Sequence, residues 1–129
     1  MKNKLLAFLV MALSLLTISG PAFAHHGTAA FDMEKVTTIK GTVVKFIFMN
    51  PHTLIYVDVA GDKGEVEHWV AEESSNNHLS RIGWSNATLK PGYPVTVIGH
   101  RAKNGAFTLE LQCEECSVSD AESKPLRNQ

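Results

Sequence analysis

Two apolar runs separated by a short polar corner occupy residues 36–59. Both runs are rich in β-branched and aromatic residues, which favour buried strands. The corner is Asn50-Pro51-His52, where proline cannot donate to a strand ladder and asparagine tolerates turn geometry. The pattern therefore predicts two strands that leave the sheet at this corner and re-enter it at Thr53.

Three further strands and one short helix are predicted downstream. Residues 65–72 alternate as a third strand after a turn that contains two glycines. Serine and asparagine residues at 74–77 can cap a short helix, and Gly83 can end it in a left-handed conformation. The Asn104-Gly105 pair predicts a hairpin between strands at 95–98 and 107–111.

This order predicts an all-β fold with one short helix, namely a small five-stranded OB-fold-like β-barrel with the order β-β-β-α-β-β. A long strand of a small barrel must bend, and Gly41 is a place where the inward-facing parity can switch toward Val44, Phe46 and Phe48. A small β-sandwich is the alternative. It would require seven strands, whereas the pattern supports five.

The N-terminal residues have the pattern of a secretory signal peptide. Two lysines precede the apolar run 5–18, which is too short to span a bilayer, and Ala22-Phe23-Ala24 is a small-x-small cleavage site. We expect four parts: a cleaved signal peptide (1–24), a flexible N-terminal arm (25–35), the barrel domain (36–112), and a Cys-x-x-Cys segment with a disordered tail (113–129). The product would be periplasmic or secreted, with no membrane attachment after cleavage.

Charge and motif content narrow the function classes. The signal segment holds two of the 12 basic residues, which leaves ten against 13 acidic residues and a formal charge of −3. Such a balance argues against a nucleic-acid partner. No nucleophile elbow, phosphate-binding glycine loop or H-E-x-x-H motif is present, so no catalytic residues are assigned and an enzyme is not expected.

The new N-terminus would begin with His25 and His26. A histidine at the first position offers its α-amine together with its imidazole, and nitrogen-rich sites bind divalent copper well. Copper is therefore the candidate cofactor. The alternative is a solvated arm without a ligand, because chain termini are usually loose unless they are tied down.

An OB-fold usually binds its ligand on strands two and three, between two flanking loops. We take His52 and His100 from these loops as further candidate metal ligands, and Glu72 as a residue that can orient an imidazole. The alternative for each histidine is that it is a surface or hydrogen-bonded residue. The alternative for Trp69 is that it packs in the core. The candidate ligand-binding face comprises His68, Trp69, Glu72 and Arg101.

Cys113 and Cys116 follow the last predicted strand. In an oxidising compartment a local disulfide is the first interpretation. A metal site that combines the two thiolates with a histidine is the second, and a redox pair is the third, because the βαβ context of thioredoxin-like motifs is missing.

Several short motifs occur together between residues 25 and 112. They are a His-His pair after the signal peptide, a GTV strand, Asn-Pro-His, Trp69-x-x-Glu72, Gly83-Trp84, Leu-Lys-Pro-Gly and Val-Thr-Val-x-Gly-x-Arg-Ala-Lys-x-Gly. As a series they resemble an uncharacterised family of small exported bacterial proteins, domain of unknown function 6152. The resemblance implies the same small barrel and assigns no activity, and the Cys-x-x-Cys segment lies outside it.

These observations lead to two hypotheses from different classes. The first is an exported binding domain for a transition-metal ion, with copper preferred. The second is a β-barrel interaction module that binds a small molecule or a partner protein on its open face, with the histidines incidental.

Overall fold

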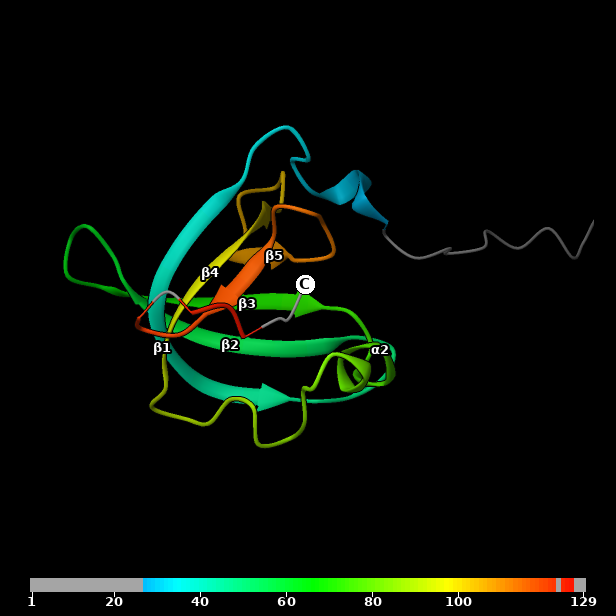
Figure 1. The fold of residues 1–129 in the computed structure, drawn as a ribbon. Helices are drawn as coiled ribbons and strands as arrows, with labels where there is room; N and C mark the ends of the chain where they lie inside the picture. Colours follow the sequence, from blue (N-terminus) through cyan, green and yellow to red (C-terminus); the bar gives the residue numbers. More distant parts are fainter. Residues whose placement is uncertain (1–26, 123, 127–129) are drawn as a thin grey trace, which may run out of the picture.

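A computed structural model describes residues 27–122 and 124–126 of the chain (Figure 1). The predicted signal peptide, His25 and His26 lie outside the described residues. The elements are η1 (Thr28–Ala30), β1 (Thr37–Ile47), β2 (Thr53–Ala60), β3 (Val66–Glu73), α2 (Asn76–Arg81), β4 (Pro94–Arg101), β5 (Thr108–Glu110) and β6 (Ser117–Ser119). Over the described residues, no helix is long and apolar enough to cross a membrane.

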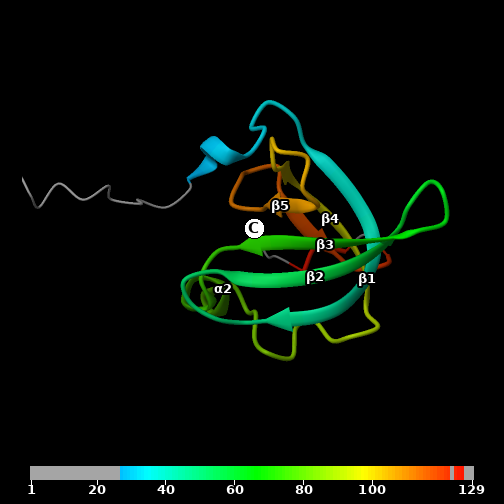
Figure 2. The same ribbon diagram turned by 180° about the vertical axis from the view of Figure 1, so that it is seen from behind.

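The strands form one sheet in the order β1-β2-β3-β5-β4-β6, and an additional pairing of β1 with β4 closes it. All neighbouring strands are antiparallel except β3 and β5, which are parallel. The closed ring consists of β1, β2, β3, β5 and β4, and β6 is an edge strand on β4 outside that ring. The predicted five-stranded barrel with one short helix is therefore confirmed. Figure 2 shows β1, β2 and β3 curving around one side of the barrel.

β1 takes part in two pairings because it bends. Its first half pairs with β4 and its second half with β2, and a register shift lies between Val43 and Lys45. Val44 is exposed at this bulge, and the inward-facing positions pass from Val43 to Phe46. The predicted change of parity exists, but it occurs at Val44 and leaves that side chain outside the barrel.

Gly41 has a different role from the one that we expected. A Cβ atom at this position would lie 2.3 Å from the carbonyl oxygen of Asp58 and 2.7 Å from a methyl group of Val57. The glycine therefore permits β1 and β2 to approach each other closely upstream of the bulge.

The core lies inside the barrel and extends to α2. The helix begins as predicted, because the Ser75 side chain accepts a hydrogen bond from the backbone N–H of His78, and Gly83 follows it with a φ of 92°. Leu79 of the helix and Trp84 after it are both buried in the core cluster. The helix lies at one end of the barrel beside the corner between β1 and β2 (Figure 1), where the backbone N–H of Asn76 donates to the Met49 carbonyl at 3.2 Å.

The C-terminal segment contains structure where the sequence predicts a disordered tail. β6 pairs with β4, and Val118 is buried against the core. The indole N–H of Trp84 donates a hydrogen bond to the carbonyl oxygen of Leu126 at 2.6 Å. A short strand with one apolar residue is too weak a pattern to predict, and it becomes ordered here because an open edge of β4 is available to it.

The N-terminal segment is also part of the fold from residue 29 onward. Phe31 is buried and forms an isolated bridge with Ala102, and the backbone N–H of Asp32 donates to the Arg101 carbonyl at 2.9 Å. Lys103 donates its backbone N–H to Ala30 and its Nζ to Ala29. The expectation of a flexible arm does not describe these residues, because one buried aromatic ring and several hydrogen bonds hold them on the loop between β4 and β5.

Candidate functional site

A pocket of about 790 Å³ lies where this N-terminal segment meets the barrel. Its walls include Gly27 and Thr28 from the segment, His52 from the corner between β1 and β2, Glu72 from β3 and Glu110 from β5. The pocket therefore joins four parts of the chain that are separated in sequence. Its volume falls within the range of about 300–1,000 Å³ that is usual for ligand sites.

The imidazole of His52 contacts the carboxylate of Glu72 inside this pocket. The Nδ1 atom of the imidazole faces Oε1 of the carboxylate, and both side chains are about one-third exposed. A carboxylate can only accept, so it holds the proton on Nδ1, and the neutral imidazole then has its lone pair on Nε2. The orienting role of Glu72 stays a prediction, and the structure places its carboxylate against the imidazole of His52.

Glu110 adds a second carboxylate beside Glu72. The two residues are direct partners in the parallel register of β3 and β5. Glu110 is only 6% exposed, and its Oε1 accepts a hydrogen bond from the backbone N–H of Gln112 at 2.9 Å. Its Oε2 is buried and has no hydrogen-bond partner among residues 27–122 and 124–126.

The ionisable side chains that line the pocket are mainly acidic. Among the described residues that line it there are two carboxylates and one histidine, and there is no lysine or arginine. A buried carboxylate oxygen without a partner is costly, and a positively charged ligand would relieve that cost. The arrangement is therefore suited to a metal ion or to a ligand that carries an amine.

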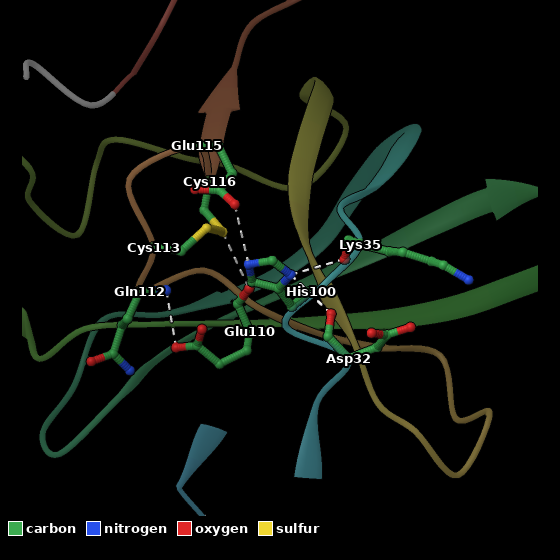
Figure 3. The surroundings of a disulfide bond; sticks show 8 residues. All are labelled: Asp32, Lys35, His100, Glu110, Gln112, Cys113, Glu115 and Cys116. Carbon is green, nitrogen blue, oxygen red and sulfur yellow. Dashed lines mark hydrogen bonds and ion pairs between the residues drawn. A yellow bond between two sulfur atoms is a disulfide. The ribbon is translucent and has the colours of Figure 1, made fainter. Parts of the chain in front are cut away.

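His100 lies in a second cluster, on the other side of Glu110 from β3 (Figure 3). It is 2% exposed, and its Nδ1 lies 3.0 Å from the carbonyl oxygen of Asp32 and 2.8 Å from that of Lys35. Its Nε2 points toward Glu115 and the two cysteines, and lies 3.6 Å from Oε1 of Glu115. The sequence analysis placed His100 with His52, but the structure separates the two histidines into different clusters.

Cys113 and Cys116 are joined by a disulfide in the structure, with their Cα atoms 5.1 Å apart. Their Sγ atoms and a ring nitrogen of His100 all lie within 4.8 Å of one another. Sγ of Cys116 also lies 3.7 Å from the carbonyl oxygen of Glu110. A disulfide sulfur has no proton to donate, so this approach is a packing contact in the oxidised protein.

Trp69 and Arg101 are in contact, but mainly with one another and with their own loop. The guanidinium of Arg101 lies 5.0 Å from the Trp69 ring and 5.3 Å from the Phe107 ring. Its N–H groups donate to the carbonyl oxygens of Gly105 and Ala106. Arg101 therefore holds the loop between β4 and β5 over the tryptophan, which is a structural role.

His68 belongs to neither cluster. It is exposed on β3, directly opposite Asp58 of β2, and its Nδ1 lies 2.6 Å from Oδ1 of that aspartate. Because successive side chains of a strand point to opposite faces, His68 faces outward while Trp69 is buried. The candidate ligand-binding face is thus divided over three separate places.

The sequence pattern did not single out two acidic residues of these clusters, Glu110 and Glu115. Glu110 alternates with buried leucines in the predicted last strand, so the period-2 pattern places it on the outer face. The pocket that this outer position shares with the N-terminal segment could not be predicted from that pattern. Glu115 had no signal beyond its place between the cysteines.

The fold and its contacts define a small closed barrel with one pocket lined by two carboxylates and a histidine, and with one histidine–cysteine cluster. Residues 12–110 match the family of unknown function DUF6152, and the chain belongs to this family. The match ends at Glu110, so Cys113 and Cys116 lie outside the matched residues. No curated protein and no solved structure matches the chain.

Proposed function

We propose that the protein is an exported binding module that holds one divalent transition-metal ion, preferably copper, in the pocket beneath its N-terminal segment. The ligands are the α-amine and imidazole of His25, the imidazole of His26, and Nε2 of His52. One observation carries the proposal: Gly27 and Thr28, which follow the two histidines directly, line the same pocket as His52 and Glu72.

The attachment of the N-terminal segment strengthens this proposal. A free arm would lose about 1–2 kcal/mol of conformational entropy for each residue that becomes fixed on docking. Residues 29–32 are already held by the Phe31 side chain and by backbone hydrogen bonds to the loop between β4 and β5. The remaining entropic cost of metal binding therefore falls on the few residues that precede them.

The chemistry of the donors favours copper. An amine and imidazoles are nitrogen ligands of the kind that Cu²⁺ binds in tetragonal geometry, and divalent affinities peak at copper. Glu72 fixes the ring of His52 through Nδ1, as carboxylates commonly do for metal-binding histidines. Glu110 adds negative charge that compensates a divalent cation.

The test is calorimetric titration of oxidised protein with Cu²⁺, so that the cysteine sulfurs are paired. Intact mass must first show that the exported chain begins at His25. We expect an extra residue before His25, and separately His52→Ala, to weaken binding at least about tenfold, which corresponds to about 1.4 kcal/mol. His68→Ala removes an exposed imidazole outside the pocket and should leave affinity unchanged. Equal copper affinity in the wild type, the extended protein, His52→Ala and His68→Ala would refute the site.

A second candidate function is favoured by the size of the pocket and by the unpartnered oxygen of Glu110. Both suit an organic cation that carries an amine. Thermal shift of metal-free protein with small amines tests this function. The stabilisation should disappear in Glu110→Gln, which preserves the side-chain shape and removes the charge. Stabilisation that persists in this variant would exclude the pocket as the binding site.

A further inference from the structure

We propose that His100, Cys113 and Cys116 form a site for a thiophilic metal ion such as Zn²⁺ when the disulfide is reduced, with Glu115 as the fourth ligand. This site is separate from the pocket that contains His52. It uses sulfur ligands, which the pocket lacks among its described lining residues.

The state of His100 is the first argument. Its Nδ1 contacts two carbonyl oxygens, which can only accept hydrogen bonds, so Nδ1 carries the proton. In the neutral form of the ring the lone pair lies on Nε2, the atom that points toward the cysteines (Figure 3). Metal-binding histidines commonly donate their other N–H to a carbonyl or a carboxylate in this way.

The surroundings of Nε2 are the second argument. The residue is almost fully buried, yet among the described residues Nε2 has no hydrogen bond, since Glu115 Oε1 lies 3.6 Å away. A histidine with a purely structural role would be expected to satisfy both nitrogens. Here one nitrogen is doubly satisfied and the other faces two sulfur atoms.

The distances are the third argument. Tetrahedral zinc with bonds of about 2.3 Å to sulfur and about 2.0–2.1 Å to nitrogen places two sulfurs about 3.8 Å apart and sulfur about 3.6 Å from nitrogen. The three ligand atoms already lie within 4.8 Å of one another. Reduction lets the sulfurs separate to this spacing through side-chain rotation. The Nε2 to Oε1 distance of 3.6 Å also suits a carboxylate as the fourth ligand.

The step that forms the site requires a reductant, and a dithiol supplies it. One thiolate of the dithiol attacks Sγ of Cys113, which is more exposed than the buried Cys116, and Cys116 leaves as a thiolate. The second thiol of the reductant then displaces Cys113, so two electrons pass to the protein and the dithiol becomes a disulfide. Zinc binds the two cysteine sulfurs as thiolates and displaces the protons that they would otherwise hold.

The experiment uses protein expressed from the full chain and purified as the cell leaves it, oxidised or reduced under argon. Zn²⁺ affinity is measured by competition with a chromophoric chelator, and Co²⁺ is used as a spectroscopic substitute. We expect one additional metal ion to bind after reduction, with thiolate-to-cobalt charge-transfer absorption that the oxidised protein lacks. Absence of this additional ion would overturn the proposal.

His100→Asn is the decisive variant, because its amide N–H group can replace Nδ1 as donor while Nε2 is removed. We expect zinc affinity of the reduced protein to fall at least about tenfold, or about 1.4 kcal/mol. The matched control, His68→Asn, removes an imidazole that lies outside the cluster and should have no effect. Unchanged affinity in His100→Asn would show that the cysteines bind metal without the histidine, against the proposal.

A measurement on the unmodified sequence covers the case in which His100→Asn does not fold. In reduced protein labelled with ¹⁵N-histidine, zinc should shift the Nε2 resonance of one ring whose Nδ1 stays protonated. Glu115→Gln, a change at an exposed side chain, should preserve that shift and weaken binding more modestly. If no histidine resonance responds to zinc after reduction, the site does not exist.

Discussion

Replacement of Phe31 by alanine should release the N-terminal segment while leaving the barrel folded. The ring is 8% exposed and forms the main apolar contact of this segment. Burial of a phenylalanine side chain contributes about 1.5–3 kcal/mol. Its loss should therefore lower the docking equilibrium constant of the segment by about 10- to 150-fold.

The global free energy of unfolding should fall by no more than the same amount, about 1.5–3 kcal/mol. Phe31 lies outside the core cluster of the barrel, so the segment can detach as a local unit before the strands unfold. Urea denaturation measures the global loss. Hydrogen exchange measures the local one, through the amides of Asp32 and Lys103, which bond to Arg101 and Ala30 across the contact.

The same variant links the fold to the proposed copper site. If only the docked segment presents His25 and His26 to the pocket, the apparent dissociation constant for copper rises in inverse proportion to the docked fraction. Met33→Ala is the matched control, because Met33 belongs to the same segment and is 40% exposed. Wild-type amide protection and wild-type copper affinity in Phe31→Ala would refute the view that this ring holds the segment.

Three further changes test the scaffold. Gly41→Ala should destabilise the protein by about 1–3 kcal/mol in urea denaturation, because its Cβ would meet the backbone of β2. In the control, Gly61→Ala, the new Cβ meets only the flexible Glu65 side chain, so the stability should stay close to that of the wild type. The double serine variant of Cys113 and Cys116 should still fold, and its free energy of unfolding should be lower by about 2 kcal/mol, because the disulfide closes a short loop. A circular dichroism spectrum without the native signal would contradict this. His52→Ala should cost no more than about 1 kcal/mol, because its contact with Glu72 is partly exposed and contributes little, and a loss above about 2 kcal/mol would identify a scaffold residue.

The elements that depend on local pattern could be predicted from the sequence. Periodicity and turn chemistry within a few neighbouring residues predict the order of strands and helix along the chain. They also predict the corner at Pro51, the cap of the short helix by Ser75 and the hairpin turn at Gly105. The closed barrel was predicted from the order of these elements, because three strands, a short helix and two more strands have few ways to bury their apolar faces.

The sites depended on contacts between distant segments, which a single sequence does not encode locally. His100 looks like a loop-edge histidine in the sequence, and it is buried only because residues 31–35 and the disulfide loop cover the outer face of β4. Glu110 follows the same rule, because alternation places it outside the barrel and the packing of the N-terminal segment then encloses it. The sequence alone determined which side chains each strand turns outward. Only the tertiary structure decided which of those outward residues are covered, because burial of the outer face depends on where the N-terminal segment and the disulfide loop pack.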